Sequence, residues 1–380
     1  PSRRRAASGK TPRGAPLASP DWRRMEDGFV RIETIHPKEL GQAEAVLWRV
    51  HQRADAALAS PYLSPDWAQA VGAVRTDARV CVIDGGRGFL GAQRLSRFSA
   101  MGLGAPIADT QGVVSEAGLG VTAGALCRAL KVGRIDFTHA PAGQTLFKPA
   151  FSEGAWVAET FSSRDLYEAA LRAKRAEFVR QTDKKLRKLT REREVTFGVS
   201  TAPADFEILL AWKRAQLKQT RQPAIWDAPW VRHVIETCFH ARAPHFAGRL
   251  FTMHVDGRVA AANFCLAGER ALHMWIIGHD EAFEAASPGV QLARWVVGWA
   301  GEHGLAEVDF GPGAYRYKRQ LSTTQRMLDW GVASGASFSG AARGAAYAVR
   351  GGMERLPSPA LAALPGKAMR RLDLARALAA

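Results

Sequence analysis

Three strand-like runs follow one another at short spacing in the second half of this chain of 380 residues. Residues 250–255 lead into Asp256-Gly257, residues 258–266 lead into Gly268-Glu269, and residues 271–277 complete the set. Asp-Gly and other glycine-containing pairs between alternating runs favour hairpin turns. The sequence therefore predicts an antiparallel meander of three strands.

Helical periodicity flanks this meander on both sides. The predicted order is helix, strand, helix, three strands, helix and strand, over residues 171–189, 195–199, 204–220, 250–277, 289–303 and 305–310. Ser287 suits an N-cap and Pro288 the first position of a helix, and Gly304 suits its C-terminal end. The last strand ends at Gly311-Pro312-Gly313.

The first half shows a weaker copy of the same order. Runs at 78–83 and 88–95 flank a turn, and a helix is expected near 123–130. Arg134-Ile135-Asp136-Phe137 then echoes Glu307-Val308-Asp309-Phe310. This echo predicts an internal duplication. We expect related domains at 28–160 and 161–335, between a disordered basic segment, 1–27, and a basic Ala/Gly-rich segment, 336–380.

The net charge of +16 is unevenly distributed. Residues 1–24, 170–194 and 341–380 carry seven, ten and seven basic residues against one, four and two acidic ones. Such segments suit an anionic partner or serve as solvated surfaces. The C-terminal segment, with Arg370, Arg371 and Arg376 among Leu and Ala, suits an anionic membrane surface or a cyclic dinucleotide.

Several classes of protein lack support in the sequence. The four cysteines are scattered, which predicts reduced thiols and neither disulfides nor a structural metal. No window approaches the ~20 apolar residues of a membrane span. Metalloprotease, esterase, P-loop and dinucleotide-binding motifs are missing. We therefore expect a cytoplasmic protein, peripheral at the inner membrane if its basic segments bind lipid.

Four stretches carry a resemblance to a known family. They are the basic Lys184-Lys185-Leu186-Arg187-Lys188-Leu189, Asp256-Gly257-Arg258-Val259-Ala260-Ala261, Ser287-Pro288-Gly289-Val290-Gln291-Leu292, and Val308-Asp309-Phe310-Gly311-Pro312-Gly313 followed by Tyr317-Lys318. With the order of elements, they resemble the FemAB-like (BioF2-like) N-acyltransferases of exopolysaccharide synthesis, which have the Gcn5-related (GNAT) fold. The resemblance covers about 165–325.

This resemblance implies an α/β fold of tandem GNAT-like domains, with mixed, mostly antiparallel sheets flanked by helices. It implies an acyltransferase that takes acyl-CoA, most simply acetyl-CoA, as co-substrate and uses no metal. The acceptor would be an amino sugar or a polysaccharide precursor. Two alternatives stay open: a Fem-type transferase that uses aminoacyl-tRNA, although nucleic acid is not the favoured partner, and a catalytically degenerate effector that binds a cyclic dinucleotide.

The candidate cofactor-binding residues lie at a helix start and a strand end. A helix N-terminus supplies N–H donors to a pyrophosphate, which points to Ser287, Gly289, Val290 and Gln291, although Pro288 removes one donor. Where two strands splay, backbone N–H groups can stabilise the oxyanion, and Ile276, Ile277 and Gly278 are expected there. Lys318 is a further candidate phosphate contact.

The candidate catalytic residues follow from acyl transfer to an amine. The amine must lose a proton, and Asp309, at a strand end before a glycine turn, is the candidate base, with a buried structural role as the alternative. His273 suits a base, an acceptor contact or a satisfied sheet histidine. Tyr315 and Tyr317 are candidates to protonate the leaving thiolate.

Overall fold

The computed structural model describes residues 30–379, so the predicted disordered segment 1–27 lies outside the described residues. The strands are β1 Ile32–Ile35, β2 Ala78–Ile83, β3 Gly88–Gln93, β4 Ala100–Gly102, β5 Val113–Ser115, β6 Ile135–Pro141, β7 Pro149–Glu159, β8 Val195–Ser200, β9 Arg242–Ala243, β10 Phe246–Val255, β11 Arg258–Ala267, β12 Ala271–His279, β13 Glu307–Pro312 and β14 Thr324–Ala333. The helices are α1 Gln42–Ala54, α2 Pro65–Gly72, α3 Ala123–Leu130, α4 Arg164–Glu192, α5 Pro203–Gln219, α6 Pro229–His240, α7 Pro288–Glu302, α8 Arg316–Leu321, α9 Phe338–Met353, α10 Pro359–Ala362 and α11 Leu364–Ala379.

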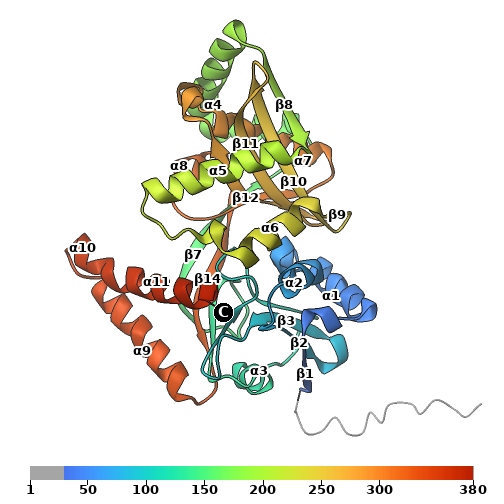
Figure 1. Cartoon of the computed structure of the whole chain (residues 1–380), viewed down its shortest axis with the longest axis vertical. Helices are drawn as coiled ribbons and strands as arrows, with labels where there is room; N and C mark the ends of the chain where they lie inside the picture. Colours follow the sequence, from blue (N-terminus) through green and yellow to red (C-terminus); the bar gives the residue numbers. More distant parts are fainter. Residues whose placement is uncertain (1–29, 380) are drawn as a thin grey trace, which may run out of the picture.

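All the strands of the described chain join one mixed sheet (Figure 1). The strand order is β1-β2-β3-β4-β6-β14-β7-β13-β12-β11-β10-β8. Counted inward from the two edges, β1-β2-β3-β4-β6-β14 and β8-β10-β11-β12-β13-β7 are arranged in nearly the same way. Each half has one parallel pair among antiparallel ones, and these pairs set Met101 opposite Asp136 and His273 opposite Asp309. The α/β architecture of tandem GNAT-like folds is thereby confirmed, and Asp136 and Asp309 occupy equivalent positions.

The two halves exchange their last strands. β7, which follows the first half, pairs with β13 of the second, whereas β14 pairs with β6 of the first. β7 and β14 also pair with each other along their length, so the sheet is continuous where two separate sheets were expected. The sequence analysis assigned no element to β7, α6 or β14. β7 and β14 each pair with a strand of the other half, so the domain boundaries at 160 and 335 stay predictions.

Helices cover both faces of the sheet. In the second half, α4 and α7 cover one face and α5 and α6 the other (Figure 1). Residues of α1 and α2 share a hydrophobic cluster with α5, α6 and β11, in which Trp67 and Phe264 are fully buried. Burial of large aromatic side chains stabilises a fold strongly. This shared cluster therefore fixes the two halves against each other.

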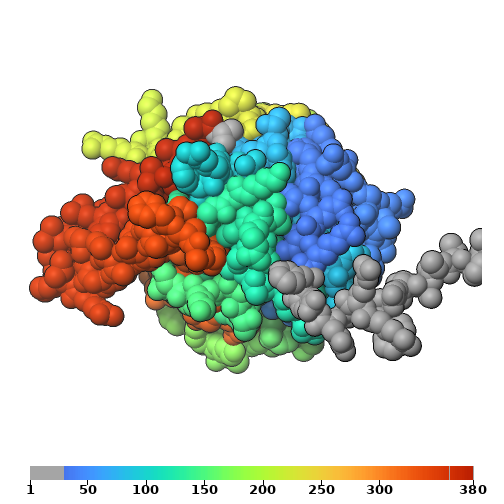
Figure 2. Space-filling view, turned by 90° about the horizontal axis from the view of Figure 1, so that it is seen from below, coloured from blue at the N-terminus to red at the C-terminus, as the bar shows by residue number. Residues whose placement is uncertain are grey.

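The C-terminal segment is folded. α9, α10 and α11 form a helical hairpin that stands out to one side of the first half (Figure 2). The buried Arg343 pairs with Asp136 of β6 and with Asp373 of α11. Ala377 is fully buried, and its carbonyl accepts a hydrogen bond from Arg75. The predicted basic Ala/Gly-rich segment, 336–380, thus contains three helices.

Two further sequence expectations can be compared with the fold. All four cysteines are buried and unpaired, as predicted. Between residues 30 and 379, no helix is long and apolar enough to cross a membrane.

Candidate active site

Strands β12 and β13 diverge in the middle of the second half. They pair in parallel only over residues 271–273 and 307–309, and the pairing stops at His273 opposite Asp309. β12 continues to His279 beside β11, with a bulge at Trp275. Beyond His273, the edge of β12 that faces β13 has no strand partner, which leaves backbone donors available to a ligand.

A buried histidine lies at the mouth of this splay between carboxylates from both halves. His273 is 1% exposed, and its Nε2 lies 3.0 Å from Oδ2 of Asp109, in the loop after β4. Its Nδ1 lies 3.9 Å from Oδ2 of Asp309, which is an ion-pair distance but too long for a hydrogen bond. The Asp109 side chain is 35% exposed, so it is the member of the cluster that solvent reaches.

Charge pairing decides the protonation of this cluster. Burial lowers the pKa of His273, but the hydrogen bond from its ring to Asp109 and the charge of Asp309 outweigh burial and raise its pKa to about 9. Burial raises the pKa of Asp109 and of Asp309, but the contact with His273 outweighs it and holds both below their ordinary value. The resting state at neutral pH is therefore an imidazolium between two carboxylates.

Asp309 also has structural partners. Its Oδ1 accepts a hydrogen bond of 2.7 Å from the Gly311 N–H. Its Oδ2 lies 3.4 Å from Arg326, which is itself bound to Glu307 at 2.7 Å. Asp309 is only 5% exposed. These contacts make it an anchor for the glycine turn and a partner of His273, while Asp109 is half-buried and the more exposed of the two carboxylates.

Gly311 allows three charged groups to converge. Its φ is +73°, in the left-handed region that residues with a Cβ rarely adopt. A Cβ at this position would lie 3.3 Å from Oδ2 of Asp109, 3.5 Å from the His273 ring and 3.7 Å from Nζ of Lys318. Burial lowers the pKa of Lys318. The glycine therefore forms the floor of a site in which a carboxylate, an imidazolium and an ammonium surround one point.

The start of α7 offers an anion few free hydrogen-bond donors. Ser287 lies at the N-cap position in a left-handed conformation, and its side chain makes no capping bond, contrary to its expected role as a cap. The Val290 and Gln291 N–H groups both donate to the Ser287 carbonyl. Pro288 has no N–H, so among the described residues Gly289 keeps the free donor of this turn. Nζ of Lys185, from the basic helix α4, donates to Ser287 Oγ at 2.7 Å and adds a cation there.

The other predicted cofactor-binding residues divide into two groups. Ile277 and Gly278 are half-buried on the free stretch of β12, whereas the Ile276 side chain is fully buried. Gln291 is buried too, and its amide donates to the Thr182 carbonyl at 2.9 Å. Gly289 is open: a Cβ there would meet only the His279 ring, at 3.6 Å. At Gly278 a Cβ would meet Leu209 at 3.0 Å and Trp212 at 3.2 Å. A cofactor can therefore approach Gly289 and the free backbone edge of β12, but not the α-carbon of Gly278 or the buried side chains of Ile276 and Gln291.

The two tyrosines lie beside the cluster. Tyr315 is 63% exposed, and Lys318 Nζ lies 5.5 Å from its ring centre. Tyr317 is half-buried and packs edge-on against Phe310 at 6.4 Å, and burial raises its pKa. The roles proposed for both as thiolate acids stay predictions.

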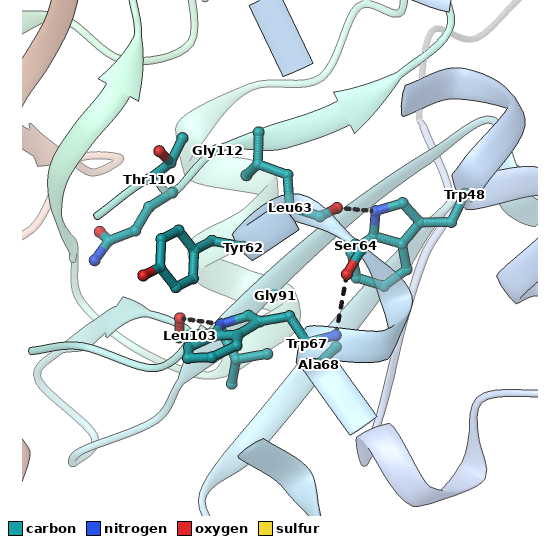
Figure 3. A pocket seen from close by; sticks show the side chains of 11 residues that line it. Trp48, Tyr62, Leu63, Ser64, Trp67, Ala68, Gly91, Leu103, Thr110 and Gly112 are labelled. Atoms are coloured by element: carbon teal, nitrogen blue, oxygen red, sulfur yellow. Dashed lines mark hydrogen bonds between the residues drawn. The ribbon is translucent and has the colours of Figure 1, made fainter. Parts of the chain in front are cut away.

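Sequence analysis missed Asp109 and Tyr62. Asp109 is the only charged residue between Arg97 and Glu116, and this isolation in a glycine-rich loop was an available signal. The Tyr62 ring packs edge-on against His273 at 4.9 Å. Tyr62 lines a cavity of about 10 Å³, room for about one water (Figure 3). The Tyr62 hydroxyl and the Gln111 amide nitrogen are buried and lack partners among the described residues.

Comparisons with known proteins agree with this geometry. Residues 154–319 match the acetyltransferase (GNAT) domain family. A solved structure of FemX has a TM-score of 0.54 at 10% identity, over 78% of this chain and 95% of that one. The C-terminal domain of a putative lysylphosphatidylglycerol synthetase from Agrobacterium fabrum gives 0.48 at 11% identity, over 80% and 95%. A tandem GNAT protein from the clavulanic acid pathway gives 0.43 at 13% identity, over 81% and 100%.

No curated protein matches the chain. The chain carries a GNAT-fold acetyltransferase domain, and the matched residues include the β12–β13 splay. A GNAT domain implies acyl-CoA as co-substrate, and the open start of α7 beside β12 fits its phosphates in part. Between residues 30 and 379, no group of three or more His, Cys, Asp or Glu is arranged to hold a metal ion.

Proposed function

We propose that this protein transfers an acyl group, most simply acetyl, from acyl-CoA to the amine of an amino sugar or polysaccharide precursor in exopolysaccharide synthesis. One observation carries the proposal. The β12–β13 pairing ends at His273 and Asp309, so a splay suited to a thioester opens directly beside a group of charged side chains. The GNAT match over residues 154–319 supports the donor.

The chemistry divides among the residues of the cluster. Attack by the amine forms a C–N bond and breaks the C–S bond of the thioester, and the amine must lose a proton. Asp109 is the proposed acceptor of that proton, because it combines a solvent-reachable carboxylate with a fixed orientation from His273. His273, whose pKa is raised to about 9 by its carboxylate partners in spite of burial, is the proposed clamp that holds Asp109 in place rather than the base.

The oxyanion and the leaving thiolate need donors. Backbone N–H groups of β12 beyond His273 are the proposed donors to the oxyanion, since no strand covers that edge. Lys318 is the proposed donor to the thiolate, because its lowered pKa eases release of a proton into the site. Its Nζ at present donates to the Pro312 carbonyl at 2.8 Å, which holds it over the glycine turn.

Binding and turnover together test this proposal. Acetyl-CoA should raise the melting temperature of the protein, and release of free thiol should depend on an added amino sugar. Salt-sensitive binding of tRNA without acetyl-CoA binding would instead favour the Fem-type alternative. Neither activity, combined with binding of a cyclic dinucleotide, would favour the effector alternative.

A membrane or a cyclic dinucleotide remains a proposed partner of the C-terminal helices, and a peripheral place at the inner membrane rests on the same proposal. Leu356, Leu361 and Leu364 are exposed near the basic Arg355 and Lys367 at the end of the hairpin. Because Ala377 and Arg343 are buried in the fold, deletion of residues 341–380 would disturb the first half. Charge-neutralising substitutions at Arg355 and Lys367, with vesicle binding as the readout, are the better test.

A further inference from the structure

A groove of about 500 Å³ separates the C-terminal hairpin from the middle of the sheet. Its floor is formed by Phe151 and Glu153 of β7 and Trp330 of β14. Its other wall includes Arg350 of α9 and Arg370 of α11, and Figure 1 shows these helices beside the two strands. The volume lies within the range of ~300–1,000 Å³ typical of small-molecule sites. The groove lies outside the β12–β13 splay.

An aromatic platform lines the floor. Phe151 and Trp330 lie nearly parallel, with ring centres 5.2 Å apart at an angle of 22°. The ring of His139 meets Trp330 edge-on at 4.4 Å. The Trp330 indole N–H and Nδ1 of His139 are buried and have no hydrogen-bond partner among the described residues. Both atoms are enclosed by the protein, and their side chains hold the pKa of Glu153 below its ordinary value, chiefly through the contact with His139, so they orient the carboxylate that lines the groove.

The charged side chains that line the groove differ in whether they already have an ion-pair partner. Arg350 lies over the Phe151 ring at 4.0 Å and binds Glu354 at 2.6 Å, so both of its contacts are within the protein and stabilise the wall of the groove. Glu153 contacts only His139, at 3.4 Å, among ion pairs in the described chain. Arg370 is exposed and forms no ion pair between residues 30 and 379. A free guanidinium at one side suits an anion, and a carboxylate at the other suits an amine or hydroxyls.

A backbone contact and a charge effect place the His139 and Glu153 side of the groove near the loop that carries Asp109. The Gln111 N–H, two residues after Asp109, donates to the His139 carbonyl at 3.3 Å. His139 has a φ of +55° where β6 bulges opposite Trp330. Such a strained conformation in a histidine is typical of functional sites. The charge of Glu153 is also close enough to act on the pKa of Lys318.

We infer that this groove binds the acceptor, an amino sugar that carries a phosphate. The apolar face of the sugar ring packs against Trp330, because Arg350 already covers the Phe151 ring. The phosphate meets Arg370, and the amine points along Glu153 towards Asp109. This inference rests on the proposed function, because it assigns the acceptor of the same reaction. It adds a binding site built from β7, β14 and the C-terminal helices.

Two adjacent arginines provide a matched test. Arg370→Gln removes the guanidinium that lines the groove, and Arg371→Gln removes an exposed neighbour that does not line it. With glucosamine 1-phosphate as the probe, Arg370→Gln should weaken binding in calorimetry and raise KM by about tenfold, the loss expected for one charge-assisted hydrogen bond. Arg371→Gln should behave as wild type, and the affinity for acetyl-CoA should be unchanged in both.

A second variant tests the platform. Trp330→Leu should raise KM for glucosamine and for its phosphate alike, while Arg370→Gln affects only the phosphate. Failure of wild type to bind glucosamine 1-phosphate, or equal effects of the two arginine substitutions, overturns the groove as the acceptor site. Acetyl transfer that is insensitive to all groove variants overturns this inference but leaves the proposed function standing. Absence of acetyl-CoA binding would instead overturn the proposed function.

Discussion

The protonation of His273 predicts a dependence of stability on pH. The pKa of this buried histidine rises from 6.5 to about 9 in the folded protein. A group with a raised pKa stabilises the folded state fully below its unfolded pKa, and this contribution disappears as pH rises through the folded value. At 1.36 kcal/mol per pKa unit, it is worth roughly 3 kcal/mol. The free energy of unfolding should fall by that amount between pH 6 and pH 9.5.

The assay is urea unfolding of wild type and His273→Gln at pH 6, 7.5 and 9.5. The difference in unfolding free energy between the two proteins should shrink by roughly 3 kcal/mol over this range, since other titrating groups cancel. His233→Gln, at an exposed position on α6, is the control for loss of an imidazole outside the cluster. A constant difference for His273→Gln, or an imidazole that titrates near 6.5 by NMR, would refute the ion-paired arrangement.

Three further substitutions probe the same site. Asp109→Asn should lower kcat by about 10²–10⁴-fold, the usual contribution of a general base. The control Glu116→Gln, farther along the same segment, should leave kcat unchanged. Equal rates for the two variants would show that Asp109 is not the base. Gly311→Ala should abolish most activity through crowding of the site, and Gly304→Ala, with φ +77° but open space around it, should cost only stability, by about 1 kcal/mol. Asp309→Asn should lower the melting temperature as well as kcat, and full activity in that variant would contradict its place in the cluster.

Local signals were sufficient for most of the second half of the fold, although not for α6 or β14. Asp256-Gly257 does form the turn between β10 and β11, and the strand and helix over 195–219 lie close to their predicted bounds. The echo between residues 134–137 and 307–310 located two equivalent strands. These features depend on turn chemistry and periodicity within a few residues, which a sequence displays directly.

The strand exchange was not predictable in this way. β7 and β14 pair with strands far away in the chain, and Gly154 and Gly331 weaken their strand signals. Their partners are chosen by the packing of two whole halves. Without β7 and β14 there was no way to foresee the groove beneath the C-terminal helices.

The site was foreseen in part for the same reason. His273 and Asp309 sit on neighbouring strands of one half, so the order of elements brought them together. Asp109 reaches His273 from the other half, across a sequence separation of 164 residues. Such contacts depend on how the halves dock, and this also decides which carboxylate solvent reaches.

Hydrogen–deuterium exchange with and without acetyl-CoA tests the central claim without knowledge of the acceptor. Acetyl-CoA should protect the free stretch of β12, residues 274–279, and the start of α7, residues 287–291, most strongly. The equivalent segments of the first half, near β4 and the start of α3, should change little. Protection centred on the first half, or no protection at saturating acetyl-CoA, would contradict an acyl-CoA site in the β12–β13 splay.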